Sequence, residues 1–314
     1  MIIVEKTPEF HIAQLLTAQG NEFHGAAVAI GKFDGLHLGH QKILAELMKG
    51  AEEGLATVVF TFDPSPMSFF SGRKIPELAT RDEKRSLFEA AGVDVLIEFP
   101  LTAETAATPP VTFVEKILVA SIGAKKIVAG RDVTFGDRGM GDYKLLESME
   151  EACGYKTVLI DKLLFRGREI SSTYVRDEIA MGHMEQAKEL LGRPYTVSGI
   201  VEYGKQLGRT IGFPTINIVP EAGKLLPPNG VYYSDVRLEG RVYHGMTNIG
   251  VKPTVKGDGV LNVETYLYDY EGDAYGAFVE VALLSFKRSE MKFNSVDDLK
   301  RQMKEDIAAG RLMW

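Results

Sequence analysis

Two histidines in a glycine-rich segment are the first residues whose spacing could serve chemistry. His37 and His40 lie in GKFDGLHLGH, which follows a short apolar run and leads into a helical pattern. Residues three apart share one face of a helix, where two imidazoles can donate hydrogen bonds to charge that develops on phosphate oxygens. The alternative is a glycine-rich turn with two solvent-exposed histidines, but the strand–loop–helix context favours a nucleotide site.

The same loop contains further groups that could lie against a phosphate. A helix N-terminus presents free N–H groups and the positive end of the helix dipole, and glycines allow the backbone to approach a ligand closely. The residues expected to contact ATP or its phosphates here are Gly31, Asp34, Gly35 and Gly39.

A second polar segment, ISSTYVRDEI, places hydroxyl groups at a predicted helix start. Arg176 comes four residues after Ser172 and therefore lies on the same helical face. The hydroxyls of Ser172 and Thr173, with an arginine one turn later, can hold a pyrophosphate-like group. An ordinary helix cap would explain the hydroxyls equally well.

A third segment, GKQLGRTIGFPTIN, could wrap a phosphate and hold a metal ion. Gly204, Gly208 and Gly212 make a flexible loop, and Thr215 and Asn217 then alternate along an extended stretch. Alternate residues of a strand point to the same side. Both carry oxygen ligands of the kind that Mg²⁺ prefers. The alternative is a strand opened by a proline, in which the two side chains only satisfy a turn.

Glu264 is an isolated carboxylate in the otherwise apolar and aromatic stretch VETYLY. A carboxylate in such surroundings is paired, lies at a strand end, or acts as a base. As a general base it could take the proton from an attacking hydroxyl. The alternation of the stretch also fits an exposed face of an antiparallel strand, and both interpretations stay open.

The first half of the chain alternates predicted strands and helices. Apolar strands between amphipathic helices indicate a parallel sheet covered on both faces. The predicted strands are 26–30, 56–62, 93–99, 125–130 and 156–160, and the predicted helices are 40–49, 81–91, 114–122 and 143–152.

The second half has a different pattern. Two short helices, 174–181 and 184–191, are divided at Gly182, and a glycine and a proline then mark a boundary. Short β-type segments with turn cues at 239–240, 257–259 and 271–273 predict a small antiparallel barrel, followed by a helix over 296–309. The barrel strands are predicted at 195–201, 231–238, 241–249, 261–268 and 277–284. We therefore predict two domains, residues 1–185 and 186–314.

Composition limits the class of protein. The 314 residues are 45% hydrophobic and 25% charged, as in soluble globular domains. The net charge of −7 argues against backbone-driven binding to nucleic acid. Cys153 is the single cysteine, which excludes an internal disulfide and a cysteine-rich zinc site and favours a reducing cytoplasm. No stretch of eighteen uncharged apolar residues occurs, so we expect no membrane span.

These motifs carry a resemblance to a known family. The His-x-Gly-His loop with the later Ile-Ser-Ser-Thr-x-x-Arg resembles the nucleotidyltransferase superfamily. The strings GKFDGLHLGHQKIL, TFDPSPMSFF, DEKRSLFEAAGVD and AGRDVTFGDRGMGD look like its flavin-adenylylating branch. The later strings GRPY, GRTIGFPTIN, NGVYYSDV, NIGVKPT, VETYLYDYEGDAYG and KRSEMKF follow the riboflavin kinase pattern in order. From end to end, the chain is similar to bacterial bifunctional riboflavin kinase/FAD synthetase.

The resemblance implies a Rossmann-like nucleotidyltransferase domain followed by a kinase barrel with a C-terminal helix. In the barrel, the riboflavin 5′-hydroxyl would attack the γ-phosphate of ATP to give FMN and ADP. Thr215 and Asn217 would hold Mg²⁺ with the nucleotide, and Glu264 would be the base. Arg288 matches an arginine near the flavin side of that pocket.

In the N-terminal domain, the FMN phosphate would attack the α-phosphate of a second ATP, giving FAD and pyrophosphate. The resemblance implies that His37 and His40 stabilise the transition state and that Ser172, Thr173 and Arg176 hold the departing phosphates. Asp132 falls where the family has a polar residue on the adenine side. The expected ligands are small molecules: riboflavin, FMN, FAD and ATP with Mg²⁺.

Four residues depart from the family pattern. Ile216 replaces an alanine between the two predicted metal ligands and is expected to face away from the metal. Ser65 replaces a common histidine, Lys32 a frequent asparagine, and Val133 a usual phenylalanine. The last three bear on flavin affinity and on the rate of adenylylation.

The sequence leaves three alternatives to the bifunctional enzyme. The chain could be an active riboflavin kinase with a weak or lost adenylyltransferase, or a flavin-binding protein without chemistry. It could also adenylylate another phosphorylated vitamin, but such an enzyme has no need of the kinase-like second half.

Overall fold

The protein, described by a computed structural model over residues 1–204, 207–252 and 260–314, forms two compact units, Met1–Ser171 and Ser172–Trp314. The predicted turn at 257–259 lies outside the described residues. The predicted domain boundary after residue 185 differs from this division and stays a prediction.

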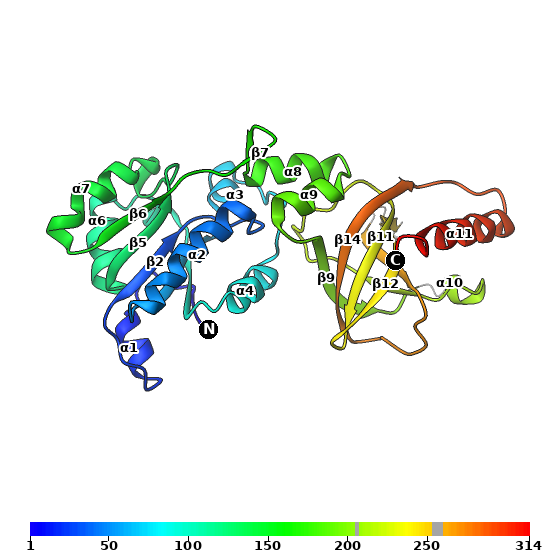
Figure 1. The fold of residues 1–314 in the computed structure, drawn as a ribbon, viewed down its shortest axis with the longest axis horizontal. Helices are drawn as coiled ribbons and strands as arrows, with labels where there is room; N and C mark the ends of the chain where they lie inside the picture. The colour runs from blue at the N-terminus through cyan, green and yellow to red at the C-terminus, as the bar shows by residue number, and fades with distance from the viewer. Residues whose placement is uncertain (205–206, 253–259) are drawn as a thin grey trace. The chain divides into compact units, whose positions relative to one another are not determined.

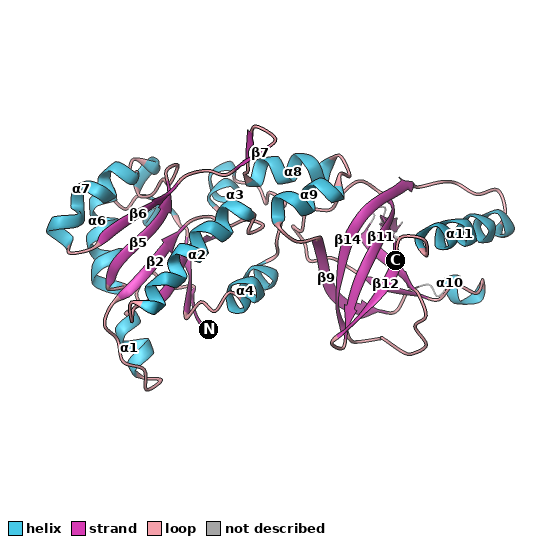
Figure 2. Cartoon of the chain, in the orientation of Figure 1, coloured by secondary structure: helices cyan, strands magenta, loops and turns pink. Residues whose placement is uncertain are grey.

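The first unit is built on a six-stranded parallel sheet with the order β1-β4-β3-β2-β5-β6. Strands β2, β5 and β6 of this sheet are labelled in Figures 1 and 2. All five predicted strands are present. The short edge strand β1 was not predicted, since its four residues carry little periodic signal. The strands are β1 (Ile2–Glu5), β2 (Ala26–Ile30), β3 (Ala56–Asp63), β4 (Val95–Pro100), β5 (Ala124–Gly130) and β6 (Lys156–Ile160).

Both faces of this sheet are buried, which is why its strands read as continuous apolar runs. Val28 and Phe60 face one hydrophobic cluster, and their neighbours Ala29 and Val59 face the other. The helices of the unit are α1 (Ile12–Thr17), α2 (Leu38–Glu52), α3 (Pro66–Ser71), α4 (Arg81–Ala90), α5 (Ala103–Ala106), α6 (Pro110–Thr112), η1 (Phe113–Ser121) and α7 (Tyr143–Cys153), with a single 3₁₀ turn, η2 (Asp137–Gly139). The predicted helix 114–122 is present as the π-helix η1.

A two-stranded ribbon of β7 (Leu164–Phe165) and β8 (Arg168–Glu169) ends the first unit. The second unit begins with α8 (Ser172–Ala180) and α9 (Met184–Leu191), which are divided at Gly182 as predicted. Gly182 has a φ of 78°, a left-handed conformation that glycine adopts without strain.

The rest of the second unit is a closed antiparallel barrel with the strand order β10-β13-β12-β11-β14-β9. Closure removes the exposed sheet edges. The elements are β9 (Tyr195–Glu202), α10 (Leu207–Thr210), β10 (Thr215–Ile218), β11 (Gly230–Leu238), β12 (Arg241–Lys252), β13 (Val260–Leu267), β14 (Phe278–Ser289) and α11 (Val296–Gly310). The structure therefore confirms the predicted barrel and its C-terminal helix.

The barrel separates an inner from an outer face along every strand. On the inner face, the buried hydroxyls of Ser234, Thr247 and Thr265 form a chain with oxygen–oxygen distances of 2.7 and 2.8 Å. On the outer face, α11 packs its residues Met303 and Ile307 against a cluster of Val231, Met246 and Tyr268. Part of the outer face is thus covered, and a neighbouring part carries the polar residues described below.

Candidate active sites

The histidine loop lies at the switch point of the parallel sheet. Strands β3 and β4 lie on one side of β2, and β5 and β6 lie on the other. In open α/β sheets, ligands bind outside the carboxyl ends of the strands at the point where the order reverses. The loop after β2 carries His37, and the loop after β5 carries Asp132. The fold therefore brings two predicted site segments to one edge.

His37 and His40 are stacked at the start of α2. Their ring centroids lie 3.7 Å apart, and His37 Nδ1 accepts a hydrogen bond of 3.4 Å from the backbone N–H of His40. Phe33 packs edge-on against the His40 ring, with 5.2 Å between the ring centroids. A Cβ atom on Gly39 would lie 3.1 Å from the His37 ring, so glycine at this position leaves space for the pair.

Both histidines are held in the neutral form. Burial lowers the pKa of His37 to about 4, although the charge of Asp132 opposes the shift. Burial, followed by the proximity of His37, lowers the pKa of His40 well below its usual range. Since Nδ1 of His37 accepts a hydrogen bond, its neutral ring carries the proton on Nε2. The His37 ring can therefore donate a hydrogen bond to a phosphate oxygen without being charged.

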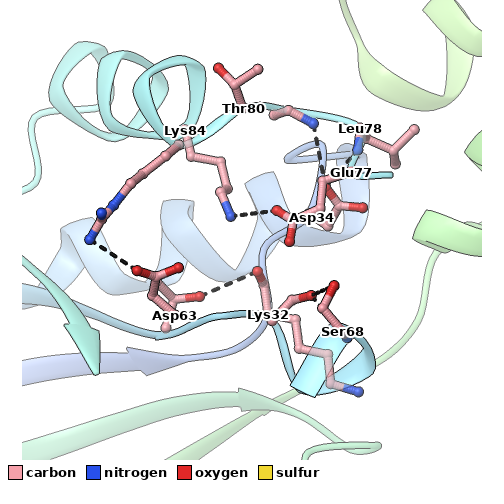
Figure 3. Close-up of polar contacts among 12 residues, drawn as sticks. Lys32, Asp34, Asp63, Ser68, Glu77, Leu78, Thr80 and Lys84 are labelled. Carbon is pink, nitrogen blue, oxygen red and sulfur yellow. Dashed lines mark hydrogen bonds and ion pairs between the residues drawn. The ribbon is translucent and has the colours of Figure 1, made fainter. Parts of the chain in front are cut away.

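Asp34 has a structural role that the sequence did not reveal. Its buried carboxylate accepts hydrogen bonds from the backbone N–H groups of Leu78, at 2.9 Å, and Ala79, at 3.4 Å (Figure 3). The neighbouring Gly35 has a φ of 78°, and a Cβ there would lie 2.7 Å from Leu78. These contacts tie the histidine loop to the segment before α4. The predicted contact of Asp34 with ATP stays a prediction.

A charged cluster that sequence reasoning missed lies at the carboxyl ends of β1, β3 and β4. Glu98 is only 4% exposed and accepts hydrogen bonds from Arg81 Nε, at 2.7 Å, and Arg85 Nε, at 2.9 Å. Burial opposes the ionisation of Glu98, but hydrogen bonds from Arg85 and Arg81 outweigh it and lower its pKa. Arg81 also pairs with Asp63, at 3.1 Å. The cluster thereby fixes the end of β3, from which the loop containing Ser65 departs.

The three departures in this unit have defined environments. Ser65 caps α3 by accepting a hydrogen bond of 3.4 Å from the N–H of Ser68. Lys32 is exposed, and its carbonyl oxygen accepts a hydrogen bond of 3.3 Å from Thr61. Val133 packs against the hydrophobic cluster of the sheet.

The remaining predicted residues of the adenylylation site lie in two places. Asp132 is exposed, lies 2.8 Å from where a Cβ on Gly130 would be, and pairs with Lys162 at 3.4 Å. Ser172, Thr173 and Arg176 lie in the first turns of α8, in the second compact unit, which confirms the predicted helix start. Their approach to the histidine pair stays a prediction.

In the barrel, Thr215, Asn217 and Glu264 come together. Thr215 Oγ1 donates a hydrogen bond of 2.5 Å to Glu264 Oε1. Strand β10 pairs with β13 so that Asn217 lies directly opposite Glu264. Ile216 is buried and lies opposite Thr265 of the inner face, so its larger side chain faces away from the Thr215 and Asn217 side chains, as expected.

Asn262 is a further polar residue of this site that sequence reasoning missed. Its Nδ2 donates a hydrogen bond of 3.3 Å to Asn217 Oδ1. Since Thr215 uses its proton on Glu264, the lone pairs of its oxygen remain available to a cation. The only sequence signal was that Asn262 precedes Glu264 by two positions and therefore shares its strand face.

Two of the predicted loop glycines lie against these side chains. A Cβ on Gly204 would lie 2.7 Å from Asn217 Nδ2, and a Cβ on Gly208 would lie 3.3 Å from Thr215 Oγ1. Gly212 has a φ of 90° and open space around it. The glycines thus allow the loop backbone to approach both predicted metal ligands.

The donor set fits a magnesium ion that is bound mainly by phosphate and water. Over residues 1–204, 207–252 and 260–314, no group of three or more His, Cys, Asp or Glu side chains could hold a metal ion. Mg²⁺ commonly takes one or two protein oxygens and completes its shell with waters and substrate phosphates. The oxygens of Thr215 and Asn217, with Glu264 beside them, match that chemistry.

Arg288 is held by the C-terminal helix. Its Nε and a terminal nitrogen lie 2.9 and 2.7 Å from Oδ2 of Asp306, which is 1% exposed. Gln302 donates a further hydrogen bond of 3.1 Å to the same carboxylate. This paired geometry orients the guanidinium at the end of β14, and its predicted flavin contact stays a prediction.

Two sites suited to phosphate transfer, one in each unit, define a two-module class of enzyme. A family model described as FAD synthetase matches residues 19–174, and one described as riboflavin kinase matches residues 191–314. The chain belongs to the bifunctional riboflavin kinase/FMN adenylyltransferase family.

Relatives with that name match nearly the whole chain. The protein of Listeria monocytogenes is 37% identical over 89% of this chain and 89% of its own. Those of Bacillus subtilis and Escherichia coli are 35% and 36% identical, over 90% and 91% of this chain and 90% and 92% of their own. The similarity to these relatives therefore spans both halves of the chain.

A solved structure has the same fold over both units. It comes from Streptococcus pneumoniae, is described as a macrolide-efflux protein, and is 30% identical with a TM-score of 0.81. The alignment covers 93% of this chain and 96% of that one. In this chain, none of the described helices is long and apolar enough to cross a membrane.

Proposed function

We propose that the protein makes both flavin cofactors from riboflavin with ATP as co-substrate. The barrel phosphorylates riboflavin to FMN, and the parallel-sheet domain adenylylates FMN to FAD with release of pyrophosphate. The observation that carries the proposal is the presence of two distinct phosphate-handling constellations in one chain of this family: the stacked histidine pair, and the Thr215–Glu264 hydrogen bond beside Asn217.

In the kinase reaction, Glu264 acts as the general base. It takes the proton of the riboflavin 5′-hydroxyl while that oxygen bonds to the γ-phosphorus of ATP and the bond to the β-phosphate oxygen breaks, releasing ADP. Thr215 and Asn217 would hold Mg²⁺, which neutralises phosphate charge when bound. The hydrogen bond from Thr215 keeps the Glu264 carboxylate oriented toward the site.

In the adenylylation reaction, an oxygen of the FMN phosphate bonds to the α-phosphorus of ATP as the bond to the β-phosphate oxygen breaks. His37 and His40 donate hydrogen bonds to the α-phosphate oxygens where charge develops. No covalent intermediate is needed. Ser172, Thr173 and Arg176 hold the departing pyrophosphate.

The remaining assignments complete the proposal. Asp132 lies on the adenine side, and Arg288 lies on the flavin side of the kinase pocket. The loop glycines of both sites, with Asp34, contact the ATP molecules. We place the boundary between the two catalytic domains after residue 185. The single cysteine supports a reducing compartment, the cytoplasm.

Incubation of the pure protein with riboflavin, ATP and Mg²⁺, followed by chromatography of the flavins, tests the proposal. FMN should form first and FAD should follow. Glu264→Ala should abolish formation of FMN but not formation of FAD from supplied FMN, and His40→Ala should do the reverse. Loss of both reactions in either variant would contradict two separate sites. FMN without FAD in the wild type would identify a kinase alone, and no conversion would identify a flavin-binding protein.

A further inference from the structure

The turn that leads into the histidine pair has an unusual backbone. Phe33 has a φ of 47° and Leu36 a φ of 43°, and both values lie in the left-handed region that bulky residues rarely adopt. Gly35, between them, has a φ of 78°. Left-handed conformations of residues other than glycine persist only where surrounding contacts hold them, and they are concentrated at functional sites. Contacts with other parts of the first unit must therefore hold this turn.

The first part of the turn is held by packing and by Asp34. The Phe33 side chain is fully buried and packs edge-on against Phe88 of α4, with 5.6 Å between the ring centroids. The Asp34 carboxylate accepts the two backbone hydrogen bonds described above, which join the turn to the segment before α4 (Figure 3). Neither contact involves the carbonyl group of Leu36, so the end of the turn needs an anchor of its own.

Gln41 is that anchor. Its side-chain Nε2 donates a hydrogen bond of 2.9 Å to the carbonyl oxygen of Leu36, and its backbone N–H donates one of 3.0 Å to the carbonyl oxygen of His37. Gln41 is half-buried and lies in the first turn of α2, so the helix fixes its position. Two consecutive carbonyl groups, one on each side of the His37 Cα atom, are therefore bound by one residue.

These two hydrogen bonds set the direction of the His37 side chain. Because a residue has only two soft backbone dihedrals, fixing the peptide planes on both sides of its Cα atom fixes the direction of its Cβ atom. With both planes held, the His37 ring stacks on His40. Without the Gln41 amide, Leu36 can return to the ordinary region of negative φ. That change rotates the peptide plane before His37 and moves its ring.

We infer that Gln41 is a positioning residue of the adenylylation reaction, whose side-chain amide holds the left-handed turn at Leu36 and thereby aims His37 at the α-phosphate of ATP. The inference rests on the proposed function of the histidine pair. Gln41 acts through the Leu36 carbonyl group and needs no contact with the nucleotide. Because His37 stabilises charge that develops in the transition state, loss of the amide should lower kcat for FAD formation and leave KM for ATP nearly unchanged.

Gln41→Met tests the inference, because methionine has a similar length and no hydrogen-bond donor. In steady-state formation of FAD from FMN and ATP, kcat should fall about ten- to hundredfold, the range expected for a misplaced catalytic group. KM for ATP should change less than about twofold, and FMN formation from riboflavin should be unchanged. NMR titration should show that the pKa of the His37 ring has moved from about 4 toward its ordinary value, because the displaced ring gains contact with water.

Gln14→Met, the same substitution at an exposed position of α1, is the matched control and should change neither kcat nor KM. Gln41→Glu keeps the shape of glutamine but cannot donate when ionised, and it replaces Gln41→Met if that variant does not fold. An unchanged kcat for FAD formation in the folded variant, or a loss confined to KM for ATP, would overturn the positioning role while leaving the adenylylation function intact. A wild-type protein that forms FMN but no FAD would reject the adenylylation function itself and the positioning role with it.

Discussion

The neutral state of His37 can be tested through the pH dependence of stability in His37→Asn. Asparagine preserves an acceptor at the N-cap of α2 but removes a ring that is only 6% exposed. In the folded protein, burial lowers the pKa of this ring to about 4. In the unfolded chain, the same ring takes up a proton near pH 6.5.

The sign and size of the effect follow from this difference in proton binding. As pH falls below 6.5, the unfolded state binds a proton that the folded state does not, so the wild type loses stability until pH approaches 4. Between pH 7 and pH 5, the free energy of unfolding should fall by about 2 kcal/mol more in the wild type than in the variant. His40 is present in both proteins, so its contribution largely cancels.

Calorimetric unfolding of the first unit at pH 7, 6 and 5 measures the difference, with the exposed His24→Asn as the matched control. Titration of the ring by NMR, assigned by its absence from the variant, measures the pKa directly. Two results would refute the low pKa of His37. One is a difference in unfolding free energy between His37→Asn and the wild type that stays constant from pH 7 to pH 5. The other is a His37 ring that titrates near pH 6.5. The assignment of His37 as a neutral hydrogen-bond donor would then fail as well.

Two further predictions concern the barrel. Gly204→Ala would place a methyl group 2.7 Å from Asn217 Nδ2. The Mg²⁺ concentration for half-maximal FMN formation should therefore rise several-fold. An unchanged Mg²⁺ dependence would contradict the role of Asn217 as a metal ligand. Asp306→Ala removes the buried partner of Arg288, and should lower the unfolding free energy of the second unit by about 3 kcal/mol. Urea unfolding followed by the fluorescence of Trp314, the only tryptophan, measures this loss, and a cost under about 1 kcal/mol would contradict the buried pair.

Sequence reasoning succeeded where the signal is local and periodic. Five strands of the parallel sheet were predicted because each is a short apolar run, and the long helices were predicted because their apolar residues recur with helical spacing. Short elements such as β1 (Ile2–Glu5) and α3 (Pro66–Ser71) were missed, since a few residues carry too little pattern. The helix at 114–122 was predicted, but its π-helical geometry was not, because side-chain spacing does not distinguish hydrogen-bond registers of one helix.

The site residues, too, were predictable only where the signal lies within one segment of the chain. His37 and His40 were predictable as a pair because three residues of separation within one helical turn place two side chains on one face. Asn262 was not singled out, because nothing within its own strand marks it. The charged cluster of Glu98 was also missed, since its partners come from distant segments of the first unit.

The amino-acid sequence by itself determined the order of strands and helices, the two motif sets and the family, because these depend on residue types and on separations along one segment. Only the tertiary structure decided which residues stand opposite one another. Closure of the barrel aligned Asn217 with Glu264 across two strands, and burial made His37 neutral. The physical reason is that strand register and desolvation arise from contacts between segments far apart in the chain.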